Sequence, residues 1–279
     1  MTKSAHNAPL PVLSPGVALL DTHCHLDFPD YQADLPEVLA RARAAGVGRT
    51  ITVGIDLPTS RAAIALAEQH SELFATVGVH PHHVKELGEA DYALLRELAR
   101  HPRVVGYGEI GLDYVKDYSP VAVQQEHFVR QVALGRELGL PLIIHDREAH
   151  ADTIAILREA LPLPAGGVMH CFSGDAAFAE EVLALGFHLS IPGVVTFPRA
   201  EAMQEAVRQV PLHRLLLETD GPFLAPVPRR GKRNEPQLLL HTAQRVAELK
   251  GLSLDEVARA TTANAEHLFR LEGRGHVDP

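Results

Sequence analysis

The chain has 279 residues, of which 46% are hydrophobic and 22% are charged, and this composition is typical of a globular protein. The net charge is −9 with histidine neutral. This charge argues against a protein that coats duplex nucleic acid with a broad basic face, but it leaves room for an enzyme that engages a few phosphates. No apolar run approaches the ~20 residues of a membrane span, so we expect no membrane association.

The first segment, residues 1–16, has none of the charged, apolar and small-residue regions of a secretion signal. Its Ala, Pro, Asn and Ser content predicts a disordered leader. One domain is expected over residues 17–273, because an α/β barrel typically needs ~250 residues, and a short tail follows at 274–279. Two cysteines do not make a disulfide framework, so we expect a cytoplasmic protein with reduced thiols.

Eight short apolar runs, rich in β-branched residues and leucine, recur along the chain and predict strands. They are Val17–Leu20, Thr50–Ile55, Phe74–Val79, Val104–Ile110, Pro141–Ile144, Val168–Met169, Phe187–Ile191 and Leu215–Leu217. Their continuous apolar character is typical of strands buried on both faces, as in parallel sheets.

The stretches between these runs predict helices. The clearest are Leu35–Ala45, Thr59–His70, Val121–Leu138, Asp175–Leu185, Pro236–Lys250 and Leu254–Leu271. Strand and helix alternating eight times predict an α/β fold, a single-domain (β/α)8 TIM barrel. The competing fold is a doubly wound open sheet, which typically has a glycine-rich phosphate loop after the first strand. This chain has Asp21-Thr-His-Cys-His25 at that place, which argues against the open sheet.

Histidines and carboxylates gather where the expected strands end. They are His23, His25, His80, His82, His83, Glu109, His145, His170, Glu218 and Asp220. A lone histidine is more often a core or surface residue, but the C-terminal strand ends of a barrel meet at one rim, where active residues lie. Imidazole and carboxylate together suit Zn, Mn, Ni or Fe, so we expect a metal site with Glu109 as its central, bridging carboxylate.

The two cysteines lie directly beside histidines of this set. Because side chains alternate along a strand, His23 and His25 share one face and Cys24 points to the other. By the same alternation Cys171 is expected to face away from His170. We therefore predict that both thiols pack as small buried hydrophobes.

Six short motifs appear in order along the chain. They are Asp-Thr-His-Cys-His-Leu-Asp (21–27), Val-Gly-Val-His-Pro-His (77–82), Gly-Glu-Ile-Gly-Leu-Asp-Tyr (108–114), Ile-His-Asp-Arg (144–147), His-Cys-Phe-Ser-Gly (170–174) and Leu-Glu-Thr-Asp-Gly-Pro (217–222). The set resembles the TatD-type deoxyribonucleases, which belong to the amidohydrolase-like metal-dependent hydrolases. The resemblance spans residues 21 to about 270.

The resemblance implies a TIM barrel that holds two divalent metal ions, with Zn, Mn, Mg or Ni as candidates. It also implies hydrolysis of phosphodiester bonds, usually of DNA from the 3′ end. Carried over residue by residue, the metal ligands are His23, His25, Glu109, His145, His170 and Asp220. Many amidohydrolase relatives use a carboxylated lysine where this chain has Glu109, and this difference favours the nuclease branch.

A basic cluster follows the last expected strand. Its members are Arg229, Arg230, Lys232 and Arg233. Barrel loops after strands seven and eight often bind phosphate, and residues 230–236 resemble the family's substrate loop. The residues expected to contact substrate are therefore His80, Arg147, Lys232, Arg233 and Asn234.

Arg147 is included because it lies two residues past His145 and should share its face, where a guanidinium can grip a phosphate oxygen. Of the aromatic residues near the rim, Tyr114 is left open between stacking and packing. Phe172 and Phe223 are predicted to pack.

The expected reaction is hydrolysis of DNA ends or short oligonucleotides by a water held between the metals. Glu109 and Asp220 carry the chemistry, with Asp220 accepting the proton of the water and Glu218 next in line for that role. One alternative is another ester, amide or lactone on the same site, such as an aminoacyl-tRNA ester. A non-catalytic metal-binding protein is a further alternative, against which the complete ligand set argues. The sequence leaves the oligomeric state open.

Overall fold

The computed structural model describes residues 9–272. Its eight strands form one sheet in the order β1 to β8, and every neighbouring pair is parallel. The strands are β1 (Leu19–Cys24), β2 (Val47–Val53), β3 (Leu73–Val77), β4 (Val104–Asp113), β5 (Leu142–Arg147), β6 (Gly167–Met169), β7 (His188–Ile191) and β8 (Leu215–Leu217). A parallel bridge between Cys24 and Gly221 joins the end of β1 to the segment after β8.

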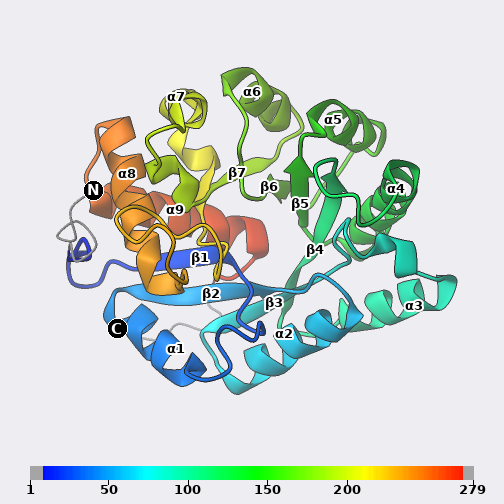
Figure 1. Ribbon diagram of the computed structural model, residues 1–279, viewed down its shortest axis with the longest axis horizontal. Coiled ribbons are helices and arrows are strands. Elements are labelled where there is room, and N and C mark those ends of the chain that lie inside the picture. Colours follow the sequence, from blue (N-terminus) through cyan, green and yellow to red (C-terminus); the bar gives the residue numbers. More distant parts are fainter. Residues whose placement is uncertain (1–8, 273–279) are drawn as a thin grey trace.

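The helices lie around the outside of this sheet (Figure 1). They are α1 (Leu35–Ala44), α2 (Leu57–Gln69), α3 (Glu89–Leu98), α4 (Val121–Leu138), α5 (His150–Glu159), α6 (Ala176–Ala184), α7 (Glu201–Gln209), α8 (Leu239–Lys250) and α9 (Leu254–Phe269). Short 3₁₀ turns cover Val84–Glu86, Gly193–Thr196, Leu212–Arg214 and Pro236–Leu238. The predicted single-domain TIM barrel is confirmed.

The bounds of three strands differ from the predicted ones in a way that matters for the rim. The structure extends β1, β4 and β5 past the apolar runs and into the polar residues that follow, as far as Cys24, Asp113 and Arg147. Backbone hydrogen bonds define a strand, so polar residues continue it where their side chains find partners at the rim. Conversely, β3 ends at Val77, and His80 lies in the loop after it.

Three helices that we did not delimit, α3, α5 and α7, complete the alternation. The predicted helix at Pro236–Lys250 begins as a 3₁₀ turn and becomes α-helical only at Leu239. The Ser253 side chain accepts a hydrogen bond from the backbone N–H of Glu256, and Glu256 accepts one from the Ser253 N–H, so α9 begins with a capping box.

The lower, N-terminal end of the barrel is closed by the end of α9. Phe269 and Leu271 are buried there in one cluster with strand residues such as Ile51, Phe74 and Leu216. A larger core lies between the sheet and its helices. Because apolar side chains fill the lower end, polar groups that need room for a ligand are left at the opposite rim, where the strands end.

The expected disordered leader covers both described and undescribed residues. Within residues 9–16, Leu13 packs against the core and the Ser14 N–H donates to Asp255 at 3.1 Å, so this part is held against the barrel. Residues 1–8 and the expected tail at 274–279 lie outside the described residues.

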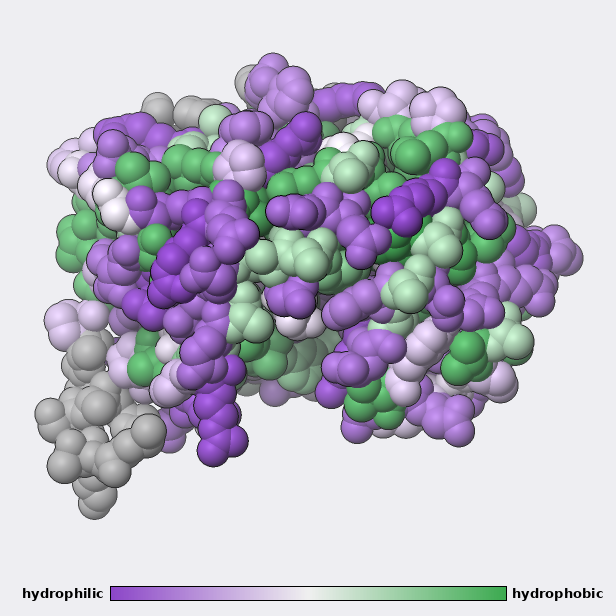
Figure 2. Space-filling model, turned by 90° about the horizontal axis from the view of Figure 1, so that it is seen from above, coloured by the Kyte–Doolittle hydropathy of each residue, from purple (hydrophilic) through white to green (hydrophobic). Residues whose placement is uncertain are grey.

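The outer surface of the barrel mixes polar and apolar side chains. On the face seen in Figure 2, hydrophilic residues surround smaller apolar areas. This mixture is usual for the outer helices of a barrel. No helix within residues 9–272 has the length and apolar character needed to cross a membrane.

Candidate metal centre

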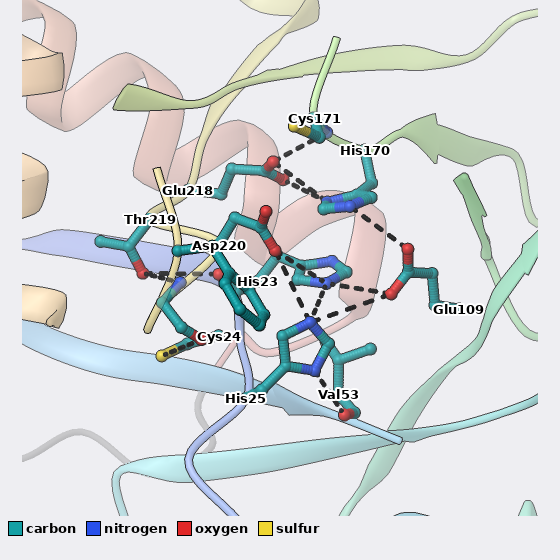
Figure 3. A network of polar contacts seen from close by, with 12 residues as sticks. His23, Cys24, His25, Val53, Glu109, His170, Cys171, Glu218, Thr219 and Asp220 are labelled. Atoms are coloured by element: carbon teal, nitrogen blue, oxygen red, sulfur yellow. Dashed lines mark hydrogen bonds and ion pairs between the residues drawn. The ribbon is translucent and has the colours of Figure 1, made fainter. Parts of the chain in front are cut away.

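A buried carboxylate, Glu109 on β4, points toward His23, His25 and His170, which come from other strand ends (Figure 3). Its Oε2 lies 3.4 Å from His23 Nε2 and 3.9 Å from His25 Nε2. Its Oε1 lies 2.8 Å from His145 Nδ1 and 3.4 Å from His170 Nε2. The two oxygens of one carboxylate therefore face two different groups of donors.

The first group joins the ends of β1 and β8. His23 Nε2 and His25 Nε2 are 3.3 Å apart, and Asp220 Oδ1 lies 3.9 Å and 3.6 Å from them, respectively. Ligands placed tetrahedrally at ~2.05 Å from an ion are ~3.3 Å apart. The spacing of these three atoms thus fits donors that converge on one divalent ion.

The second group joins β4, β5 and the end of β6. Besides His145 and His170, His80 brings its Nε2 within 3.4 Å of Glu109 Oε1. The backbone N–H of His82 donates to His80 Nδ1 at 3.1 Å, which leaves the proton of a neutral His80 ring on Nε2. In that tautomer His80 is a hydrogen-bond donor and not a ligand, which separates its role from that of the other rings.

The orientation of two ligand rings is set by their outer nitrogens. His25 Nδ1 donates to the carbonyl of Val53 at 3.2 Å, and His170 Nδ1 lies 3.0 Å from Glu218 Oε1. With the proton held on Nδ1, each ring turns the lone pair of Nε2 toward Glu109. Metal-binding histidines are usually held by outer partners of this kind.

The charges around the rim suit a metal site. Burial, together with the neighbouring His170, lowers the pKa of His23 to about 3, so this ring is neutral. Burial alone would raise the pKa of Glu109, but His170, His80 and His145 lower it well below its usual value. Burial alone would lower the pKa of His145, but Asp113 and Glu109 raise it to about 9. Against the same effect of burial, Glu218 and Glu109 raise the pKa of His170 well above its usual value. Imidazole binds a metal in its neutral form, so an ion at these two rings would displace their protons.

Two carboxylates support the ligands, and we assigned neither of them this role from the sequence. Asp113 Oδ2 lies 2.8 Å from His82 Nε2 and 3.3 Å from His145 Nε2. Strand alternation could have found it, since Asp113 shares a face of β4 with Glu109. Glu218 is fully buried and is bonded to His170 and to the backbone N–H of Cys171, which leaves it poorly placed as the alternative proton acceptor that we considered.

A third carboxylate, Asp21, locks β1 to the turn after β8. It accepts hydrogen bonds from the Thr219 N–H at 2.9 Å, from the Thr219 hydroxyl at 2.5 Å and from the His23 N–H at 3.3 Å. Asp220 and His23 belong to the same donor group, so this link between the strands fixes their separation.

The two cysteines, which we predicted to pack away from the neighbouring histidines, differ in their surroundings. Cys24 is buried against the Gly221 carbonyl and the Tyr31 hydroxyl, away from the donors, as predicted. For Cys171 the basis of the prediction does not hold, because β6 ends at Met169 and Cys171 has a φ of +45°, so strand alternation does not apply, and the residue is only partly buried. Its Sγ lies within 4.8 Å of ligand atoms of His170 and Glu218.

The residues expected to contact substrate lie in different settings. Arg147 is half exposed on the rim, 3.9 Å from Asp113 Oδ2, and Lys232 is exposed. The Arg233 guanidinium instead makes hydrogen bonds of 2.7 and 2.8 Å to Asp34, and it lowers the pKa of that carboxyl to about 2.

The side chain of Asn234 is buried within the loop after β8. Its amide donates at 2.7 Å to the carbonyls of Thr219 and Phe223, and its Oδ1 accepts from the Glu235 N–H. These bonds give Asn234 a role in shaping the loop rather than in presenting a group at its surface.

The aromatic residues near the rim also have different roles. Phe172 is buried, as predicted, and the Tyr114 hydroxyl donates to Asp152 at 2.6 Å. Phe223, predicted to pack, is 50% exposed, and its ring stands edge-on to His25 with a centroid separation of 6.3 Å. The prediction failed because the ring projects from the turn after Asp220 instead of lying on a strand.

Comparison with known proteins agrees with this geometry. A family model described as TatD related DNase matches residues 20–270. A *Bacillus subtilis* protein named as the uncharacterized metal-dependent hydrolase YabD is 46% identical over 253 residues, which cover 91% of this chain and 99% of that protein. An *Erwinia amylovora* protein named 3′-5′ ssDNA/RNA exonuclease TatD is 40% identical over 259 residues, covering 91% of this chain and all (100%) of that protein.

Among solved structures, the crystal structure of YjjV, a TatD homolog from *Escherichia coli* K12, superimposes with a TM-score of 0.86 at 34% identity. The superposition covers 90% of this chain and 98% of that one. A family match over nearly the whole chain, close relatives along their full length and a rim of metal-type donors lead to one conclusion: the chain belongs to the TatD family of metal-dependent hydrolases.

Proposed function

We propose that the protein hydrolyses phosphodiester bonds of single-stranded nucleic acid from the 3′ end, using two divalent ions. The observation that carries the proposal is the placement of Glu109, whose two oxygens face separate donor groups. The relative named 3′-5′ ssDNA/RNA exonuclease supports the choice of substrate.

In this proposal His23, His25 and Asp220 hold one ion, His145 and His170 hold the other, and Glu109 is shared. Two bound ions supply a nucleophilic water of lowered pKa and screen the charge of the phosphoryl oxygens. What the chain itself provides is a set of donors held in place before substrate arrives, so that little reorganisation accompanies the reaction.

Asp220 is the side chain best placed to accept a proton. Its side chain is 13% exposed, against 4% for that of Glu109, so Asp220 lies nearer the opening of the site. A general base needs contact with both the attacking water and a route for the proton to leave. Asp220 meets both requirements, and the buried Glu218 meets neither.

The phosphate is held by donors on the β3–β5 side of the rim. His80 offers the proton on Nε2 beside Glu109, and Arg147 offers an exposed guanidinium at the end of β5. A guanidinium can form two parallel hydrogen bonds to phosphoryl oxygens. Lys232 contributes charge from the loop after β8, whereas Arg233 is engaged with Asp34.

The test uses metal-stripped protein and single-stranded DNA or RNA labelled at one end. We expect no cleavage without metal, and stepwise shortening from the 3′ end when Mg, Mn, Zn or Ni is added separately. A 3′-terminal phosphorothioate linkage should slow the reaction, whereas a 5′-terminal one should not. Activity on a nitrophenyl ester with none on any phosphodiester would refute the proposal in favour of another ester substrate.

A further inference from the structure

Two aromatic rings stand beside the metal-type donors on the β1–β8 side of the rim. The ring of Phe28 lies nearly parallel to His25, with centroids 4.8 Å apart. The ring of Phe223 stands edge-on to Phe28, with centroids 5.9 Å apart and an interplanar angle of 82°. We propose that the exposed face of Phe223, backed by Phe28, is the wall on which a nucleobase of the substrate stacks.

The exposure of Phe223 is unusual within this chain. All nine phenylalanines lie within residues 9–272, and Phe223 alone among them is exposed, while the other eight are buried or partly buried. A single exposed apolar side chain is common on protein surfaces and means little by itself. This one lies three residues after Asp220, and its ring centroid is 6.3 Å from that of His25, so an exposed aromatic ring lies beside the donor groups.

The fold holds the backbone of Phe223 in place before any ligand binds. The Phe223 N–H donates to the carbonyl of Asp220 at 2.9 Å, which ties the backbone of Phe223 to that of a metal-type donor. The buried amide of Asn234 donates to the Phe223 carbonyl, and the Asn234 N–H donates to the Pro222 carbonyl at 3.0 Å. A contact residue fixed in this way loses little conformational freedom when a ligand binds.

The chemistry of the site points to a base as the partner of this ring. The inference rests on the proposed function, in which a phosphate lies at the donor groups, and the sugar of one nucleotide can bridge from there to Phe223. Every base has a π-face, so stacking tolerates any sequence. The chain has no tryptophan and only 5% aromatic residues, which suits one stacking position at a strand end and not a long track.

Phe28 has a different role from Phe223. Its ring is stacked on His25, so one of its faces is covered, and it stands nearly perpendicular to the Phe223 ring. It supports the wall and limits the movement of His25. Phe223 is therefore the side chain whose replacement tests the inference.

The experiment measures binding and needs no turnover. Isothermal titration compares deoxyadenosine 5′-monophosphate with deoxyribose 5-phosphate on the metal-loaded protein, so the ratio of the two dissociation constants isolates the base. We expect the wild type to favour the nucleotide about 5- to 150-fold, the range measured for base–aromatic stacking. Phe223→Ala should bring the ratio near one, and Phe223→Trp should keep it.

Two further variants sharpen the result. Val227→Ala removes another exposed apolar side chain from the same loop, and it should leave the ratio unchanged. Phe223→Leu keeps apolar bulk without an aromatic face, and it should lower the ratio as the alanine variant does. Metal content is measured for each variant so that a damaged centre is recognised.

Three outcomes would overturn the inference: a wild-type protein that binds both ligands equally or binds neither, a Phe223→Ala variant that keeps the full preference, or a leucine variant that behaves as wild type. The proposed function fails separately. A protein that prefers the nucleotide over the sugar phosphate but cleaves no polynucleotide would not be an exonuclease. A protein that cleaves polynucleotides but binds the nucleotide and the sugar phosphate equally would not stack a base on Phe223.

Discussion

Replacing Asp220 by asparagine separates proton transfer from metal binding. Asparagine keeps the shape of the side chain and one oxygen near His23 and His25, but it loses the basicity of the carboxylate. The backbone at Asp220 has a φ of +56°, a conformation that asparagine adopts several-fold more often than most residues. The substitution therefore adds less backbone strain than alanine would.

The expected size of the effect follows from the role proposed for Asp220. Loss of a general base lowers kcat by about 10²–10⁴, which corresponds to ~2.7–5.5 kcal/mol of barrier. Glu109 and four histidines remain, and these five donors exceed the four that a closed zinc site needs, so roughly one ion or more per chain should stay bound. The assay pairs kcat and KM on 3′-labelled single-stranded DNA with elemental analysis of the same sample.

Glu218→Gln is the matched comparison, because it neutralises a carboxylate that lies two residues before Asp220, after the same strand, and contacts His170 instead of the opening. Excess metal should restore its kcat but not that of Asp220→Asn. A near-normal kcat for Asp220→Asn would remove this residue from the chemistry. Loss of all bound metal would make its role structural, and the proton acceptor would then have to be sought outside the donor set.

Three further results are expected. Removing metal with a chelator should lower the unfolding temperature by several degrees in differential scanning fluorimetry, since an ion at 100 times its Kd stabilises the fold by about 2.7 kcal/mol; an unchanged transition would speak against a metal centre. Glu218→Gln should weaken metal binding about 10- to 100-fold in a chelator competition, as loss of an outer partner does, and unaltered affinity would contradict the positioning role. Arg147→Ala should raise KM for short DNA by a factor that corresponds to a binding free energy of roughly 1.5–3 kcal/mol. Arg233→Ala should leave KM unchanged, because Arg233 is paired with Asp34. The reverse pattern would show that the ion pair between Arg233 and Asp34 opens to substrate.

Several features of the rim were open to prediction because they follow from local rules. The apolar runs indicated strands, their alternation with helices indicated a barrel, and a barrel brings its C-terminal strand ends to one rim. The shared face of His23 and His25 follows from strand alternation. Glu109 and the other five residues expected as metal ligands do come together in the structure.

Other features depended on contacts between distant parts of the chain. Arg147 and Arg233 look equally suited to phosphate in the sequence, but Arg233 meets Asp34 on the segment before α1, 199 residues away. The alternation argument failed for Cys171 because β6 ends at Met169, as predicted, and the backbone has a positive φ at Cys171. No local sequence pattern shows the backbone conformation after a strand ends, or which side chain lies opposite across the rim.

The sequence by itself therefore determined the kind of fold and the donors of the candidate metal centre, because strand periodicity and residue chemistry are local properties. Only the tertiary structure decided that Asp113 and Glu218 orient the ligand rings, that Asn234 shapes its loop, and that Phe223 faces outward. These roles depend on distances and exposure, which arise only when separate strand ends are packed together around the barrel axis.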